Sequence, residues 1–153
     1  MSSPHRKHIL IVEDYVSTRE TMARLLVSAG YEVSEAEHGF SALLQLRRDV
    51  PDLILSDLNM PQMSGFEFLS VVRRRFPEVL VVAMSGDYGA ADVVPGGLMA
   101  EAFYAKGQNK PEVLLKLIAD LFQTSASKVI ARTRPSAPVW IPELASIARR
   151  ATG

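Results

Sequence analysis

The sequence predicts an α/β fold in which five parallel strands alternate with helices. Short runs rich in Val, Ile and Leu recur along the chain, and segments with helical spacing of apolar residues separate them. Four of these runs end in a polar residue, namely Asp14, Asp57, Ser85 and Lys106. Buried parallel strands have this near-continuous apolar character. Their alternation with helices is typical of a parallel sheet that carries helices on both faces.

The first half of the chain supplies three strands and two helices. The strands are predicted at residues 9–14, 31–36 and 53–57. We expect the first helix to begin at Ser17, because Ser17 and Glu20 fit a capping box, and to stop at Gly30. Residues 31–36 alternate enough to form an edge strand. The second helix, around residues 40–46, ends before Pro51.

The second half supplies the remaining two strands, at residues 79–85 and 102–106. Ser64 and Glu67 fit another capping box, which opens the third helix. Residues 89–102 form a poor helix, because Pro95–Gly97 lies in the middle of them. Apolar residues repeat with a clear helical period over 113–122. The pattern is therefore (βα)5, and the doubly wound, flavodoxin-like order 2-1-3-4-5 places the second strand at an edge.

Composition favours a single soluble domain. The chain has 153 residues, 48% of them apolar, which is enough for one core. It has no cysteine, so no disulfide or thiolate site is available. No apolar stretch approaches the roughly 18 residues of a membrane span, and the N-terminus lacks the apolar core of a signal peptide. We therefore expect a cytoplasmic protein without membrane contact.

The four polar residues at strand ends carry the functional prediction. Taken singly, an Asp after a strand is commonly a helix cap or turn residue, and Ser85 or Lys106 fits a loop. Taken together they converge, because ligands in an open parallel sheet bind beyond the carboxyl ends of the strands. Crowded carboxylates repel each other, and a hard divalent cation with oxygen ligands relieves this repulsion. The set therefore suits a cation and a phosphoryl group.

Residues 8–122 resemble the receiver domain of two-component response regulators, of the single-domain type. The resemblance rests on the Glu13–Asp14 pair after the first strand and on the Asp57-Leu-Asn-Met-Pro-Gln-Met-Ser-Gly65 loop after the third. Ser85 stands in the place of the hydroxyl residue of the fourth strand. Lys106 stands in the place of the lysine of the fifth.

The resemblance implies a role for each acidic residue. Asp57 would accept a phosphoryl group from a phosphohistidine on a sensor histidine kinase or phosphotransfer protein. Asp14, Asp57 and the backbone carbonyl of Asn59 would bind Mg²⁺, with Glu13 acting directly or through water. Phosphoryl transfer requires mainly positioning and compensation of charge, and Mg²⁺ favours one or two carboxylates together with phosphate oxygens.

The resemblance also implies how the site would signal. Ser85 and Lys106 would contact the phosphoryl oxygens. Tyr104, two residues before the lysine, matches the aromatic switch position, so that Ser85 and Tyr104 would couple the site to the surface formed by the fourth helix, the fifth strand and the last helix. Family members usually have proline after this lysine, whereas here it is Gly107, so that we expect a trans peptide bond at this position.

Two other functions fit parts of the pattern. A Mg²⁺-dependent phosphohydrolase would use Asp57 as a covalent nucleophile, but such enzymes usually carry a second Asp two residues later, where this chain has Asn59. A receiver-like interaction domain without phosphorylation would be favoured had Asp57 or Lys106 been lost. We therefore expect a phosphoacceptor rather than an enzyme.

The C-terminal residues are predicted to form a tail rather than a domain. Residues 1–124 hold 12 Lys and Arg against 16 Asp and Glu, whereas residues 125–153 hold five against one. Within this tail, Ser125–Ser127 and 134–138 are typical of a linker. An apolar stripe at helical spacing follows Trp140: Ile141, Leu144, Ala145 and Ala148.

Because a helix of about ten residues is marginal alone in water, this stripe needs a surface to cover. That surface is this receiver, a second copy in a homodimer, or a downstream protein target. The predicted tail is about 30 residues long, too short for an independent DNA-binding domain. The mildly acidic body disfavours nucleic acid as a partner, so we expect signalling through protein docking.

Overall fold

The predicted strands form one parallel sheet. A computed structural model describes residues 5–86, 100–107 and 109–133, with side chains in the last helix described up to residue 126. The strands are β1 (His8–Val12), β2 (Glu32–Ala36), β3 (Leu53–Asp57), β4 (Leu80–Ser85) and β5 (Ala102–Ala105). They pair in parallel in the order β2-β1-β3-β4-β5, which confirms the predicted fold class and places β2 at an edge.

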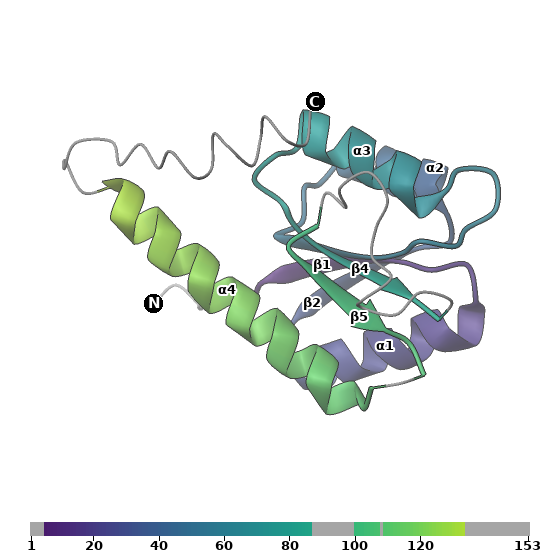
Figure 1. The fold of residues 1–153 in the computed structure, drawn as a ribbon, viewed down its shortest axis with the longest axis horizontal. Coiled ribbons are helices and arrows are strands. Elements are labelled where there is room, and N and C mark those ends of the chain that lie inside the picture. The colour runs from purple at the N-terminus through teal and green to yellow at the C-terminus, as the bar shows by residue number, and fades with distance from the viewer. Residues whose placement is uncertain (1–4, 87–99, 108, 134–153) are drawn as a thin grey trace, which may run out of the picture.

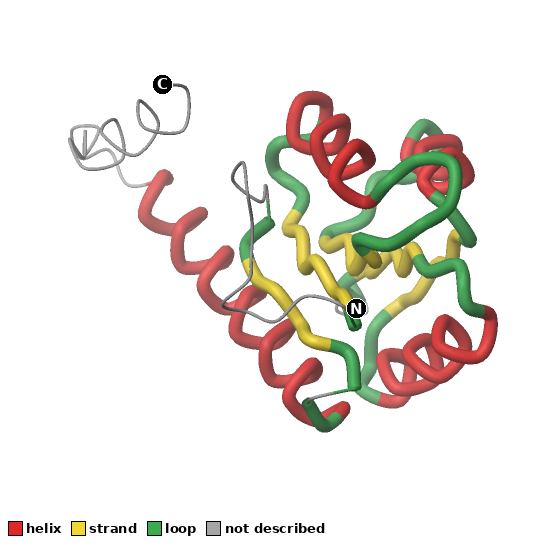
Figure 2. The backbone as a smooth tube through the Cα atoms, turned by 45° about the vertical axis from the view of Figure 1, so that its right-hand side comes forward, coloured by secondary structure: helices red, strands yellow, loops and turns green. Residues whose placement is uncertain are grey.

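Helices cover both faces of the sheet (Figure 1). The helices α2 (Gly39–Leu46) and α3 (Gly65–Arg75) lie on one face, and α1 (Val16–Ser28) and α4 (Pro111–Thr133) lie on the other. Figure 2 shows the same layers after a turn of 45°. Neighbouring side chains of a strand point to opposite faces, so Leu10 joins the cluster under α2 and α3, while Ile9 and Ile11 join the cluster under α1 and α4.

One of the two predicted capping boxes is found at its helix N-terminus and the other is not. In α3, the Ser64 side chain accepts a hydrogen bond from the Glu67 amide at 3.2 Å, as predicted. In α1 the prediction was wrong, because the helix begins one residue before Ser17 and Tyr15 is the N-cap, without a side-chain cap. The short turn after β1 brings the Arg19 amide to the Tyr15 carbonyl at 2.9 Å, which closes the first turn early.

The last helix is longer than predicted. We expected linker at Ser125–Ser127, but α4 continues through these residues to Thr133. Ser and Ala are tolerated inside helices, and the next proline along the chain is Pro135. The boundary at residue 124 therefore does not coincide with the end of a helix. The predicted poor helix around Pro95–Gly97, most of which falls within 87–99, and the tail beyond Thr133 lie outside the described residues.

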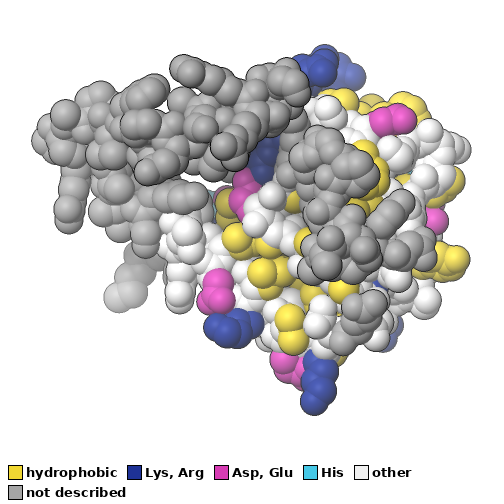
Figure 3. Space-filling view, in the orientation of Figure 1, with side chains coloured by type: hydrophobic (Ala, Val, Ile, Leu, Met, Phe, Trp, Pro, Cys, Tyr) yellow, Lys and Arg dark blue, Asp and Glu magenta, His cyan; other side chains and the backbone are white. Residues whose placement is uncertain are grey.

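The register of the sheet brings four strand ends to one edge. Val12 pairs with Ser56, Asp57 with Met84, and Ser85 with Ala105. The residues that follow β1 and β5, and the last residues of β3 and β4, therefore lie at the same edge. On the side of the molecule drawn in Figure 3, several Lys and Arg side chains lie beside Asp and Glu side chains in small mixed groups, among hydrophobic and neutral ones.

Candidate functional site

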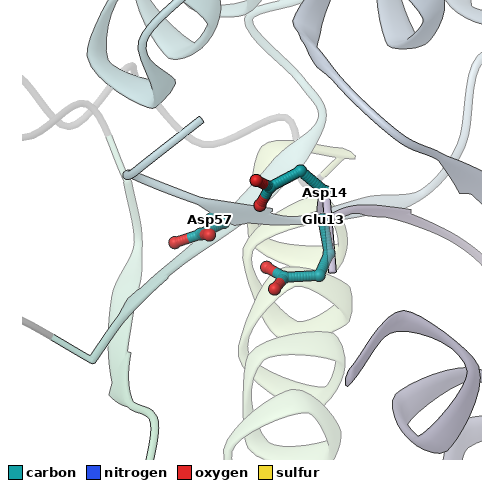
Figure 4. Close-up of side chains that lie close together, drawn as sticks. All are labelled: Glu13, Asp14 and Asp57. Atoms are coloured by element: carbon teal, nitrogen blue, oxygen red, sulfur yellow. The ribbon is translucent and has the colours of Figure 1, made fainter. Parts of the chain in front are cut away.

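Three carboxylates meet at the edge where β1 and β3 end. Glu13 and Asp14 directly follow β1, and Asp57 is the last residue of β3. One carboxylate oxygen from each residue lies within 4.8 Å of the others. Figure 4 shows the Glu13 and Asp14 side chains turned toward the side on which the Asp57 carboxylate lies. Neighbouring residues of a strand would point to opposite faces, so both can reach this site only because β1 has already ended at Val12.

Two of these carboxylates are buried and the third is half-buried. Glu13 has no exposed surface and Asp57 is 2% exposed. The Asp14 oxygen Oδ1 is buried and has no hydrogen-bond partner within the described part of the chain. Buried polar atoms are normally paired, and an orphaned one often marks a place for an ion or water. The chemistry of this donor set therefore fits a hard divalent cation with oxygen ligands.

Lys106 supplies the positive charge of the cluster. Its ammonium Nζ lies 3.2 Å from both carboxylate oxygens of Glu13 and 3.3 Å from Oδ2 of Asp57. Burial acts to lower the pKa of Lys106, but the charges of Asp57 and Glu13 outweigh it, so this pKa stands above its usual value. Lys106 is therefore an ammonium at neutral pH and bridges two of the three acids.

The cluster still carries too much negative charge for one lysine to compensate. Burial, and after it the negative charge of Asp57, raises the pKa of the Glu13 carboxyl from 4.5 to about 7. The ion pair with Lys106 offsets only part of this rise. A proton therefore stays on Glu13 at mildly acidic pH when no cation is bound, because the site disfavours a further negative charge.

The loop after β3 orients Asp57. The Asn59 amide donates to Asp57 Oδ1 at 3.2 Å, and the Asn59 side-chain nitrogen donates to Ser85 Oγ at 3.5 Å. Asn59 thus connects the end of β3 to the end of β4. A Cβ built on Gly65 would lie 2.4 Å from the Asp57 carbonyl oxygen and 2.5 Å from Leu58 Cα. Only glycine allows α3 to start this close to the Asp57 backbone.

Comparison with known proteins agrees with this geometry. The sequence profile of the response regulator receiver domain matches residues 9–119. The chain belongs to the response regulator receiver family. This receiver is 34% identical over 112 residues to the response regulator protein FleR of Pseudomonas aeruginosa, covering 72% of this chain and 24% of that protein. It is 33% identical over 129 residues to the transcriptional regulatory protein ZraR of Klebsiella oxytoca, covering 84% and 27%.

Solved structures show the same likeness. The chemotaxis response regulator CheY4 of Vibrio cholerae superposes on the receiver with a TM-score of 0.70 and 32% identity, covering 76% of this chain and 98% of that one. The chain spans about a quarter of the length of the curated relatives FleR and ZraR, which are much longer. Among the described helices of the receiver, none combines the length and the apolar character that a membrane span requires.

In this receiver Tyr104 is buried on the face of the sheet that α1 and α4 cover. Its ring is 6% exposed and packs in the cluster under α1 and α4 with Leu114 and Ile118. Its hydroxyl donates to the carbonyls of Asn109 and Lys110, at 3.0 and 3.4 Å. The ring also lines a cavity of about 500 Å³ between α1 and the start of α4. Tyr104 is thus joined to the loop that follows Lys106, and within the described residues no hydrogen bond joins it to the three carboxylates.

Sequence reasoning missed two partners of the site. The ion pair between Lys106 and Glu13 was not predicted, although both residues were assigned to the site. Arg19, on the second turn of α1, donates to the Glu13 carbonyl at 2.7 Å and was not singled out at all. The only signal available was its position five residues after Asp14, which alone does not distinguish it from a surface arginine.

Proposed function

We propose that this receiver accepts a phosphoryl group on Asp57 from a phosphohistidine of a sensor histidine kinase or phosphotransfer protein. The observation that carries the proposal is the Asp57 carboxylate, held by the Asn59 amide and Lys106 at the point where three acids meet. An Asp57 oxygen would bond to phosphorus as the phosphorus–nitrogen bond breaks. The electron pair returns to the imidazole nitrogen, and the product is an acyl phosphate.

Mg²⁺ is the cofactor that we infer for this reaction. Asp14, Asp57 and the Asn59 carbonyl would hold it, with Glu13 as a direct or water-mediated ligand. The unpartnered Oδ1 of Asp14 and the raised pKa of Glu13 support this, because both indicate a site short of positive charge. When bound, Mg²⁺ would compensate the charge on the phosphoryl oxygens.

Lys106 and Ser85 are the remaining groups proposed to contact the phosphoryl oxygens. The Lys106 ammonium already lies 3.3 Å from Asp57. Ser85 is fully buried at the end of β4, next to Asn59. Its hydroxyl would donate to a phosphoryl oxygen, a charge-assisted hydrogen bond stronger than a neutral one. Movement of Ser85 and of the Lys106 loop, to which Tyr104 is tied, would then pass the change outward.

The output of the receiver would be the docking of a protein. We propose residues 1–124 as the receiver and 125–153 as a tail that contributes to docking on a downstream protein target or on a second copy. We propose cytoplasmic location, since histidine kinases donate their phosphoryl groups there, and we do not propose nucleic acid as a partner. Hydrolysis of small phosphoesters is not favoured, because Asn59 cannot act as the general acid that such enzymes place two residues after the nucleophile.

The test is labelling of the full chain by a small phosphodonor such as acetyl phosphate, with Mg²⁺ and with EDTA. We expect labelling of the wild type only with Mg²⁺, none in Asp57→Asn, and loss of the label in hydroxylamine. Asp52→Asn is the matched control, since Asp52 precedes the same strand at its opposite end and accepts from the His8 amide at 2.8 Å. Label retained in Asp57→Asn would refute the assignment.

A further inference from the structure

Arg19 is a charged side chain beside the acidic cluster to which the proposed reaction assigns no role. It lies on α1 and its side chain is 15% exposed. Its Nη1 donates to the Glu13 carbonyl at 2.7 Å, and its Nε lies 3.4 Å from Glu35 Oε1 on the edge strand β2. The guanidinium thus connects the end of β1 to a helix and to a neighbouring strand.

Arg19 forms hydrogen bonds to the backbone on both sides of Asp14. Its backbone amide donates to the Tyr15 carbonyl at 2.9 Å, one residue after Asp14, and its guanidinium binds the Glu13 carbonyl, one residue before it. The Glu13 amide in turn donates to the Ala36 carbonyl at 3.0 Å. The peptide group before Asp14 is therefore held through its carbonyl, and the peptide groups one step further out on each side are held as well. Together these bonds restrict the direction in which the Asp14 side chain leaves the backbone.

We propose that Arg19 is a positioning residue that holds the Glu13–Asp14 backbone so that both carboxylates face Asp57. This inference rests on the proposed function of that site. Glu13 has no exposed surface, so its carbonyl cannot turn to water if the guanidinium is removed. The peptide would have to move to find another donor, and Asp14 would move with it. Oδ1 of Asp14 makes no hydrogen bond within the described residues that could restore its place.

Removal of the Arg19 side chain should change Mg²⁺ affinity in opposite directions if it positions ligands and if it acts only through its charge. By charge alone, removal of an arginine near a cation site would strengthen the binding of Mg²⁺. Glu35 already pairs with Arg19, so its net effect on the local potential is small. Loss of a group that orients metal ligands typically weakens metal affinity by about 10- to 100-fold. We therefore expect Arg19→Met to bind Mg²⁺ at least about 10-fold more weakly.

The experiment compares wild type, Arg19→Met, Arg19→Lys and Arg24→Met as full chains, with Mg²⁺ dissociation constants from calorimetry. Arg19→Lys keeps one donor and should recover part of the affinity. Arg24→Met is the matched control, because Arg24 is exposed on the same helix and makes no hydrogen bond or ion pair within the described residues. It should leave the dissociation constant nearly unchanged. Unchanged or tighter binding by Arg19→Met, or no recovery with lysine, would overturn the proposal.

A second measurement does not depend on Mg²⁺. In the metal-free protein, Arg19→Met should speed amide hydrogen exchange at Glu13 several-fold, while exchange at Ile54 in the middle of β3 stays the same. Equal exchange at Glu13 in both proteins would also overturn the proposal. If the wild type binds no Mg²⁺ and takes no label on Asp57, the proposed function fails, and the exchange measurement still decides the role of Arg19. Should Arg19→Met not fold, Arg19→Lys carries both measurements with smaller expected changes.

Discussion

Neutralising Glu13 should make the metal-free protein more stable, although Glu13 forms an ion pair. In the folded protein its pKa is raised from 4.5 to about 7, by burial first and then by the charge of Asp57. The folded state therefore holds a proton between about pH 4.5 and 7 that the unfolded state has lost. Stability from this group is full below about pH 4.5 and is lost as pH rises through about 7.

The size of this loss follows from the pKa values. A rise from 4.5 to about 7 corresponds to about 3 kcal/mol of lost stability above pH 7. The raised pKa already includes the attraction to Lys106, so the ion pair does not reverse the sign. Gln has nearly the same shape and no charge. The free energy of unfolding of Glu13→Gln should thus exceed that of the wild type by about 3 kcal/mol at pH 8. For a chain of this length this corresponds to a rise in Tm of about 6–12 °C.

The assay is thermal and urea unfolding in EDTA at pH 5 and pH 8. At pH 5 the two proteins should differ little, because Glu13 is protonated in the folded wild type. Glu20→Gln, with an exposed side chain on α1, is the matched control and should change little at either pH. With Mg²⁺ at pH 8 the difference in stability should become smaller or change sign, since only the wild type can use Glu13 as the proposed direct or water-mediated ligand. Wild type equal to or more stable than Glu13→Gln at pH 8 in EDTA would refute the reasoning.

Three further outcomes are expected. Asp14→Ala should weaken Mg²⁺ binding in calorimetry more than Glu13→Ala, because Lys106 already occupies both oxygens of Glu13 while Oδ1 of Asp14 is unpartnered; the reverse order would contradict the ligand assignment. Gly65→Ala should cost at least about 2 kcal/mol in urea unfolding and reduce labelling, since its Cβ meets the backbone of Asp57. Gly39→Ala should cost less, because its Cβ meets a side chain, that of Met63, and no backbone atom; equal costs would argue against the contact at Gly65. Tyr104→Phe should lower the free energy of unfolding by about 1 kcal/mol, because the hydrogen bonds of the hydroxyl are lost. In the wild type, a Tyr104 NMR signal that stays unchanged on activation with beryllofluoride would contradict the coupling of Tyr104 to the site.

Local patterns were enough to predict the sheet and the place of the site. Each strand is a short apolar run, and parallel strands must bring their carboxyl ends to one edge, so the convergence of Asp14, Asp57, Ser85 and Lys106 follows from topology alone. The edge position of β2 followed from the alternation of polar and apolar residues over 31–36. These predictions needed no knowledge of which side chains touch.

The errors arose where tertiary contacts decide between local options. Ser17 suits an N-cap by type, but the turn after β1 is closed one residue earlier by bonds from Arg19. Ser125–Ser127 has the composition of a linker, yet α4 continues through it. The pair between Lys106 and Glu13 joins residues 93 positions apart, which no local pattern encodes. Side-chain partners of this kind depend on the assembled fold.

The position of Tyr104 changes where a signal from the site would go. Strand neighbours alternate between faces, and β5 places Phe103 in the cluster with α2 and α3 and Tyr104 in the cluster with α1 and α4. A phosphoryl group that draws Lys106 away from Glu13 would move the loop whose carbonyls bind the Tyr104 hydroxyl. That movement would reach the cavity between α1 and α4, which the Tyr104 ring lines. Coupling through Tyr104, if it occurs as proposed, would therefore lead to the face of α1 and α4, and the opposite face would have to be reached through Ser85 or Phe103.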